Sequence, residues 1–407
     1  MTASLCSQMN AHAPAAMPRP ILALFAVASG MSVANVYYAQ PLLDALAAAF
    51  AIEPALIGAV VGATQLGCAL ALLLLVPLGD RLDRRRLLLG QIIGLLLSLV
   101  LVALSGSVTM LLTGMLLVGL LGTAMTQGLI AHAAASAKPE ERGRVIGAAQ
   151  GGVFIGLLLA RVISGGIADL GGWRSVYLLA AVMMTILAVP LWRYLPTVPS
   201  GVLAPGYARL LGSMLTLLKT DRTLQVRGTL ALFMFATFNV FWSALVLPLT
   251  GPAHGFSHTQ VGALGLVGAC GALMAARAGH WADRGWAQRT SAVALTLLVL
   301  AWWPLAGMEH SLPALLLGIV LLDVGGQALH VTNQSLILRG QSDAHGRLVA
   351  LYMLFYALGS GTGAVAATYV YARHGWLGVC ILGATLSASA LGFWIISRRY
   401  AEPRGVA

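Results

Sequence analysis

Long apolar stretches, each separated from the next by a short polar segment, follow one another from about residue 20 to about residue 397. A helix that crosses the hydrocarbon core of a bilayer needs about 20 apolar residues, and the stretches have about this length. The pattern therefore predicts an all-α membrane protein with about twelve transmembrane helices. The expected helices cover residues 21–46, 55–78, 87–104, 108–134, 145–168, 176–194, 228–249, 260–282, 290–306, 312–338, 348–371 and 377–396.

Several short motifs occur twice, in the same order and at a constant spacing. Gly143-Arg144 is followed 203 residues later by Gly346-Arg347, and Gly172-Trp173 is followed at the same spacing by Gly375-Trp376. Halves that both enter from the same side of the membrane are parallel repeats, so we predict two pseudo-symmetric bundles of six helices. The expected organisation is a disordered cytoplasmic tail (1–19), an N-terminal bundle (20–195), a cytoplasmic linker with an amphipathic segment (196–227), a C-terminal bundle (228–397) and a second cytoplasmic tail (398–407).

The distribution of charge gives this topology an orientation. The chain is 59% hydrophobic, only 9% of its residues are charged, and its formal net charge is +11. On a soluble protein such a charge would suggest nucleic-acid binding. Here, however, most Lys and Arg residues lie in alternate loops, as the positive-inside rule describes. Both termini are therefore expected in the cytoplasm, and no nucleic-acid partner is expected.

The sequence shows no pattern typical of catalysis or of a cofactor. Its four cysteines lack metal-ligand spacing and suggest no disulfide framework. It also has no phosphate-binding glycine loop and no nucleophile–base constellation. We therefore expect no metal, no cofactor and no enzyme activity. A receptor without transport activity is disfavoured as well, because no added soluble domain is visible.

Two charged loops, half a chain apart, carry a resemblance to a known family. Residues 76–85 read Val-Pro-Leu-Gly-Asp-Arg-Leu-Asp-Arg-Arg, and a related loop contains Asp283 and Arg284. The first loop is similar to the signature Gly-x-Leu-x-Asp-Arg-x-Gly-Arg-Arg of the major facilitator superfamily, with Val76 and Asp83 in place of its two glycines. Beyond its tail the whole chain resembles that superfamily, and most closely its bacterial drug–proton antiporter-type efflux proteins.

The resemblance implies a function. Such a protein would be a secondary active transporter of the bacterial inner membrane, a monomer in the lipid bilayer that rocks its two halves to alternate access. It would export small amphipathic or organic compounds, with the proton as coupling ion. Two features depart from the antiporter pattern: residues 115–119 lack an expected Arg, and Ala160-Arg161 replaces a Gly-Pro pair. Uptake or facilitated transport of a small polar or anionic metabolite therefore stays open as the alternative.

The resemblance also implies a gating role for the charged loops. Asp80 would dock at the helix that begins near Gly346-Arg347, where unpaired N–H groups carry a partial positive charge. By symmetry, Asp283 would dock near Gly143-Arg144. The alternative is that both are solvated loop charges that only serve topology. The candidate gating residues are Asp80, Arg81, Arg84, Asp283, Arg284, Arg144 and Arg347.

One face of the helix expected at 312–338 is unusually polar. Asp323, Gln327, His330 and Gln334 are spaced 4, 3 and 4 residues apart, which places them on one face, with Asn333 nearby. An ionisable side chain inside hydrocarbon is costly unless it faces protein or water. Asp323 is therefore the candidate proton-coupling carboxylate, and the other four are candidate cavity residues. A structural network that holds this helix to its neighbours is the alternative.

Arg161 is the second charge expected inside the membrane. It could contact an anionic group of a substrate, because a guanidinium matches the geometry of a carboxylate, or it could pair permanently with Asp323. In the superfamily the first, fourth, seventh and tenth helices line the cavity, which makes their polar residues candidate contacts. For each of them, packing or an interhelical hydrogen bond is the alternative. These candidates are Asn35, Tyr38, Gln127, Asn239 and Trp242.

Overall fold

A computed structural model describes residues 17–196, 206–339 and 345–398 of the chain. Within these ranges the backbone forms helices and no strand. Most of the two predicted tails falls on residues 1–16 and 399–407, which lie outside the described residues. The side chains of Asp80 and Asp283 lie outside the described set as well.

Eleven helices among the described residues are long and apolar enough to cross a membrane. The longest, α17 (His345–Ser397), bends at Gly375, whose φ of 63° and ψ of −162° are not helical. Glycine permits this bend because it has no Cβ to oppose a positive φ. The bend divides α17 into the last two predicted helices. The prediction of an all-α membrane fold with about twelve spanning helices in two bundles is therefore confirmed.

The first half of the chain forms the first six spans. Asp83 caps α5 (Arg84–Ala103) by accepting a hydrogen bond from the N–H of Arg86, and Ser107 caps α6 (Val108–Ser136) in the same way. Such caps satisfy N–H groups that the start of a helix leaves unpaired. The other elements are α2 (Arg19–Tyr37), η2 (Gln40–Leu42), α3 (Leu43–Phe50), α4 (Ala59–Leu70), η3 (Ala71–Leu75), η4 (Val76–Asp80), α7 (Arg142–Gly171) and α8 (Trp173–Tyr194).

The second half follows a short amphipathic helix, α9 (Tyr207–Thr220). The next helix, α10 (Arg222–Ala244), begins at Arg222 rather than at the predicted residue 228, because Asp221 caps it by accepting from the N–H of Leu224. The other elements are α11 (Val246–Thr250), α12 (His258–Val267), α13 (Ala269–Trp281), η5 (Ala282–Trp286), α14 (Ala287–Leu300), α15 (Trp302–Ala306), α16 (Leu312–Ile337) and α17.

Each half packs its first and fifth helices through the same close contact. In the first half, a Cβ added at Gly156 of α7 would lie 2.2 Å from the backbone oxygen of Gly30 in α2. In the second half, a Cβ added at Gly363 of α17 would lie 2.4 Å from the backbone oxygen of Ala236 in α10. Small residues let membrane helices approach this closely. The repeated contact is the structural counterpart of the sequence repeat.

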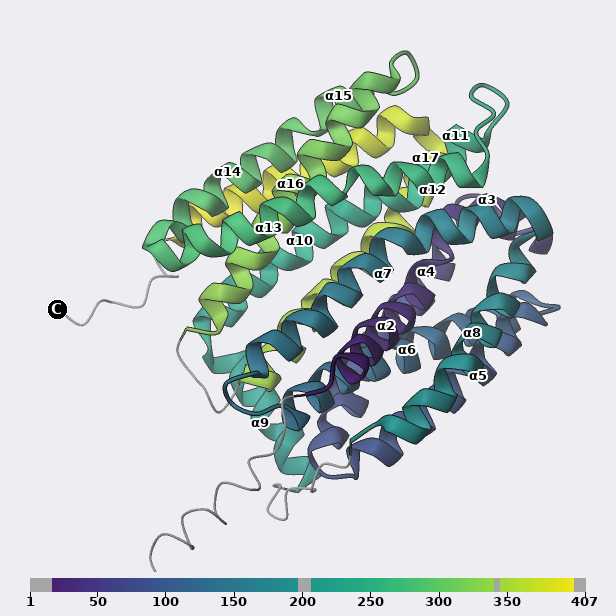
Figure 1. The fold of residues 1–407 in the computed structure, drawn as a ribbon. Helices are drawn as coiled ribbons and strands as arrows, with labels where there is room; N and C mark the ends of the chain where they lie inside the picture. Colours follow the sequence, from purple (N-terminus) through teal and green to yellow (C-terminus); the bar gives the residue numbers. More distant parts are fainter. Residues whose placement is uncertain (1–16, 197–205, 340–344, 399–407) are drawn as a thin grey trace, which may run out of the picture.

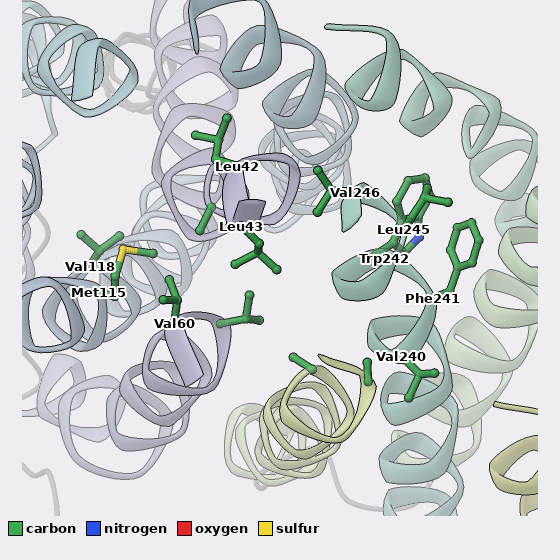
Figure 2. Close-up of a cluster of buried hydrophobic side chains, with 14 of the residues drawn as sticks. Leu42, Leu43, Val60, Met115, Val118, Val240, Phe241, Trp242, Leu245 and Val246 are labelled. Carbon is green, nitrogen blue, oxygen red and sulfur yellow. The ribbon is translucent and has the colours of Figure 1, made fainter. Parts of the chain in front are cut away.

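The two halves touch at one end of the molecule, which we call the α11 end (Figure 1). There η2 and α3 of the first half contact α11 of the second. The apolar side chains of this region, drawn in Figure 2, include Leu42 and Leu43 from one half and Leu245 and Val246 from the other. Between the halves, α7 packs against α12 and α4 packs against α17. The molecule is thus sealed by direct contact at the α11 end.

The opposite end, which carries α9, is hollow between the halves. A cavity of about 300 Å³ is lined there by Gly79, Arg84 and Gln127 of the first half and by Gly346 and Arg347 of the second. We call this the α9 end.

Candidate functional site

Arg161 of α7 and Asp323 of α16 are both buried where the two halves meet, with 3% and 4% of their surface exposed. The two groups attract each other electrostatically. No direct ion pair joins them in the part of the chain that the structure describes. Among the described residues, Nη2 of Arg161 and Oδ2 of Asp323 are both buried without a hydrogen-bond partner. Buried charges without a direct partner are costly, which makes this arrangement the candidate functional site.

A stripe of glycines brings the two charges near each other. The glycines follow one another every three residues, from Gly262 in α12 to Gly271 in α13, between α7 and α16. A Cβ at Gly262 would lie 2.3 Å from the backbone oxygen of Arg161, and a Cβ at Gly268 would lie 3.0 Å from Oδ2 of Asp323. Larger residues would force these helices apart. The stripe therefore sets the distance between the two charged groups.

The guanidinium of Arg161 is fixed by residues from both halves. Its Nε donates a hydrogen bond to Oε1 of Gln40 at 2.9 Å, and its central carbon lies 4.2 Å from the ring centre of Trp242. Nε2 of Gln40 donates in turn to Oδ1 of Asn239 at 3.1 Å, which connects η2 to α10. The predicted candidates Asn239 and Trp242 therefore lie in direct contact with this network.

A pair of tyrosines also connects the halves beside this network. The hydroxyl of Tyr37 in α2 forms a hydrogen bond with the hydroxyl of Tyr356 in α17. Tyr38, the residue predicted from the sequence, is half-buried and packs against buried apolar side chains. Asn35 is buried and donates to its own helix, while its Oδ1 has no partner among the described residues. Thus the hydrogen bond to the opposite half comes from Tyr37, the neighbour of the predicted residue.

The polar face predicted for α16 is divided between two environments. Asp323 and Gln327 face the glycine stripe, since a Cβ at Gly271 would lie 3.0 Å from Cγ of Gln327. Oε1 of Gln327 is buried without a partner among the described residues. These two residues therefore lie against α13 of their own half.

The remaining residues of that face lie within the second half. Nδ1 of His330 lies 2.9 Å from the hydroxyl of Tyr352, and Oδ1 of Asn333 accepts a hydrogen bond from Nη1 of Arg227 at 3.4 Å. Arg227 is fully buried, and sequence reasoning missed it because it was expected in a loop. Gln334 is half-buried. His330 and Asn333 thus bond to residues of their own half.

The α9 end brings together several predicted gating residues. Arg84 donates from Nε to the backbone oxygen of Gly79 at 2.9 Å, and Arg347 donates from Nη1 to Oγ of Ser213 in α9 at 2.8 Å. Both arginines line the cavity there, as does Gln127.

Arg81, Arg144 and Arg284 are not among the described residues that line this cavity. Arg144 pairs with Glu141 of its own helix at 2.8 Å. Arg81 and Arg284 are exposed. Asp80 and Asp283, the two predicted latches, have side chains outside the described set.

One group of titratable residues was not predicted from the sequence. At the α11 end, His258 lies between Asp44 and Asp169 of the first half. The three residues occupy positions far apart along the chain, and no spacing rule connects them. The only signal was that these charged or titratable side chains stand near helix ends on the side that carries few arginines.

Comparisons with known proteins agree with this architecture. The sequence profile of the Major Facilitator Superfamily matches residues 22–337 and, in a second match, residues 228–407. The uncharacterized transporter YgaY of Escherichia coli O157:H7 is 39% identical over 374 residues, which cover 92% of this chain and 94% of that protein. Multidrug resistance protein MdtG of Yersinia enterocolitica is 24% identical over 350 residues, which cover 84% of this chain and 83% of that protein.

A solved structure shows the same fold. It is a bacterial homologue of the human lysosomal transporter Spinster, in an inward-facing and unoccupied conformation, and it matches with a TM-score of 0.77. The match covers 95% of this chain and 98% of that chain, at 15% sequence identity. At this identity the likeness concerns the fold alone.

Proposed function

The chain belongs to the major facilitator superfamily, and we propose that it exports small organic, amphipathic compounds across a bacterial inner membrane in exchange for protons. It would work by alternating access, in which the two halves rock about a site between them. The observation that carries the proposal is the Arg161–Asp323 couple. Two opposite charges from opposite halves are buried together, and each has an atom without a hydrogen-bond partner within the described ranges.

Asp323 is the carboxylate that we propose to bind the coupling proton. When it is ionised, its attraction to Arg161 favours the arrangement in which α7 and α16 lie close to the same face of α12. When it is protonated, that attraction is lost. A ligand shifts an equilibrium between two conformations only if it binds them with different affinity. A proton on Asp323 meets this condition because its binding changes an interaction between the halves.

The surroundings of Arg161 suit a small amphipathic substrate. Trp242, Tyr37 and Tyr356 offer aromatic surface, while Gln40 and Asn239 offer amide groups. Binding sites for small organic molecules commonly combine a mostly apolar lining with a few placed polar groups. The proposed substrate would therefore place an apolar body against the aromatic rings and a polar group near Arg161 or Asp323.

We propose that the α9 end faces the cytoplasm, because Arg81, Arg84, Arg144 and Arg347 gather at that end. The cavity of about 300 Å³ would then open toward the cytoplasm. Such an orientation would place the predicted N-terminal and C-terminal tails in the cytoplasm. The protein is proposed to act as a monomer in the lipid bilayer.

The same end supports a gating role for Asp80. Gly79 and Arg84, which flank the loop, line one cavity together with Gly346 and Arg347 at the start of α17. Little movement would bring the loop to the N-terminus of α17, where a carboxylate is stabilised. The equivalent proposal for Asp283 rests on the sequence repeat alone, since Arg144 is paired with Glu141.

A second candidate function is uptake or facilitated passage of a small polar or anionic metabolite. The observation that favours it is Arg161 itself, whose Nη2 has no partner among the described residues. In this case the guanidinium would bind a carboxylate of the substrate rather than balance Asp323.

Transport by purified protein in proteoliposomes distinguishes the two functions. With an acidic lumen, an exporter that exchanges protons for organic compounds accumulates the dye ethidium, and an ionophore that collapses the proton gradient abolishes the accumulation. Protein-dependent entry of benzoate into liposomes without a proton gradient, with no transport of ethidium, would favour the second function. If neither compound moves faster than in liposomes without protein, the proposed export of such compounds is wrong.

A further inference from the structure

The α11 end contains a histidine held between two carboxylates of the opposite half. Nδ1 of His258, the first residue of α12, lies 2.9 Å from Oδ1 of Asp169 at the end of α7. Its Nε2 lies 3.0 Å and 3.1 Å from the two carboxylate oxygens of Asp44 in α3. About a quarter of each side chain is exposed, at 22%, 25% and 26%. We call these three residues the α11 clasp.

The geometry of the α11 clasp requires a doubly protonated ring. A neutral imidazole has one N–H donor, and its second nitrogen is an acceptor that a carboxylate repels. Only the imidazolium can donate to both carboxylates at the observed distances. The ring would therefore hold Asp44 and Asp169 together when it carries the second proton, and would hold only one of them when it does not.

The backbone of α12 binds one side of the clasp independently of that proton. Asp169 accepts hydrogen bonds from the N–H groups of His258 and Thr259, at 3.1 Å and 2.8 Å, and from the hydroxyl of Thr259. A carboxylate at a helix N-terminus is stabilised in this way. The contact between His258 and Asp44 has no such support, so it depends most directly on the charge of the ring.

No other charged side chain among the described residues touches the ring. Asp44 reaches it from α3 and Asp169 from α7. On its own side of the interface, Ser257 and Gln260 bond to each other as a capping box, and His254 bonds to the backbone oxygen of Pro248. The described residues also form no group that could hold a metal ion. The ligand that this geometry suits is a proton.

The clasp lies where the halves must part for the α11 end to open. A Cβ added at Gly165 of α7 would lie 2.2 Å from the backbone oxygen of His258, so the two helices are in close contact at this point. Separation of the two halves would pull His258 away from Asp169 of α7 and from Asp44 of α3. The charge of the ring therefore acts directly on the equilibrium between the closed and the open α11 end.

We propose that Asp44, Asp169 and His258 form a second proton-binding site, separate from Asp323, which holds the outer end shut while it is protonated. The inference rests on the proposed alternating access and orientation, but not on the substrate or on the role of Asp323. A proton from the outside would restore the clasp and return the transporter to its inward-open state. Loss of that proton would release Asp44 and favour opening to the outside.

Distances between spin labels test this proposal without any substrate. Labels on cysteines that replace Leu104 and His310, at the α11 end of the two halves, would report its opening in lipid nanodiscs. The four native cysteines would be replaced beforehand. A second pair, at the exposed residues Leu82 and Trp286, would report the α9 end. We expect the ratio of open to closed α11 ends to rise roughly fivefold between about pH 6 and about pH 10, the size expected for one partly exposed ion pair.

Variants of the histidine separate the clasp from other titrating groups. His258→Gln should lose most of the change in opening between the two pH values, whereas His258→Arg, which keeps its charge, should stay closed at both. Asp44→Asn should lose the pH response as well, and it serves as the test if a histidine variant does not fold. The proposal is overturned if the pH response of His258→Gln or Asp44→Asn equals that of the unaltered protein, or if the unaltered protein shows none.

A further variant separates this proposal from the proposed function. Asp323→Asn should keep the part of the pH response of the α11 end that depends on His258, because Asp323 is not part of the clasp. If Asp323→Asn transports normally while His258→Gln loses its pH response, the role of Asp323 fails and the clasp stands. If instead Asp323→Asn loses proton-driven transport while His258→Gln keeps the pH response, the clasp is wrong and the role of Asp323 stands.

Discussion

The guanidinium carbon of Arg161 lies 4.2 Å from the ring centre of Trp242, so a cation from one half of the molecule stacks on an aromatic ring from the other. Arg161 is almost fully buried. A cation over the face of a tryptophan contributes about 0.5–1 kcal/mol at exposed sites and about 2 kcal/mol or more when it is desolvated. This contact therefore compensates part of the cost of burying a charge between the two halves.

Replacing Trp242 by leucine should lower the thermal stability of the purified protein. The loss of a desolvated cation–π contact predicts a destabilisation of roughly 2 kcal/mol, visible as a lower melting temperature by intrinsic fluorescence in detergent. Trp242→Phe should lose less, because phenylalanine keeps an aromatic face. Trp303→Leu is the matched control, since Trp303 is 85% exposed. An equal loss in Trp303→Leu would show that the stacked contact has no special effect.

Asp323→Asn should uncouple transport from protons. The amide has nearly the shape of the carboxyl group but cannot take up or release a proton, so proton-driven accumulation of ethidium in proteoliposomes should be lost. Exchange of ethidium across the membrane without a proton gradient should continue. Asp221→Asn is the matched control, because asparagine caps a helix about as well as aspartate does. Unchanged proton-driven accumulation in Asp323→Asn would remove Asp323 from the coupling mechanism.

Hydropathy and the internal repeat were sufficient to predict the helices, because each spanning helix is defined by local composition. The bend at Gly375 also fell between two predicted helices. The start of α10 was placed too late because Arg222 and Arg227 suggested a loop, whereas Asp221 caps a helix there and Arg227 is buried within the second half. Polarity alone does not distinguish a loop arginine from a buried one.

The sequence predicted those residues of the candidate site that are unusual within a single helix, but not the contacts between helices. Asp323 and Arg161 stood out because charges are rare inside apolar stretches. Their common neighbour, the glycine stripe that includes Gly262 and Gly268, depends on which helix lies between α7 and α16. The same limit applies to His258, whose partners come from two helices of the other half. Contacts of this kind are set by tertiary packing and leave no periodic signal in the sequence.

Asp80→Asn should slow transport if the loop before α5 docks at the start of α17. A carboxylate at a helix N-terminus contributes about 0.3–1 kcal/mol, so we expect a decrease of roughly twofold to fivefold in the rate of ethidium transport. Asp83→Asn is the matched control in the same loop, because Asp83 caps α5 and asparagine can replace it in that role. Transport at the original rate in Asp80→Asn would remove the gating proposal.

Gly262→Ala should disturb the interface between the halves more than alanine at any other glycine of the stripe. The added Cβ would lie 2.3 Å from the backbone oxygen of Arg161. Backbone cannot move aside as a flexible side chain can, so α7 and α12 must separate, at a cost of roughly 1–3 kcal/mol. The matched control is Gly147→Ala in α7, where nothing lies within 4 Å of the new Cβ and alanine favours the helix by about 1 kcal/mol. The melting temperature should therefore fall for Gly262→Ala and stay constant or rise for Gly147→Ala. Equal effects would mean that the stripe does not set the approach of the helices, and the distance between Arg161 and Asp323 would then need another explanation.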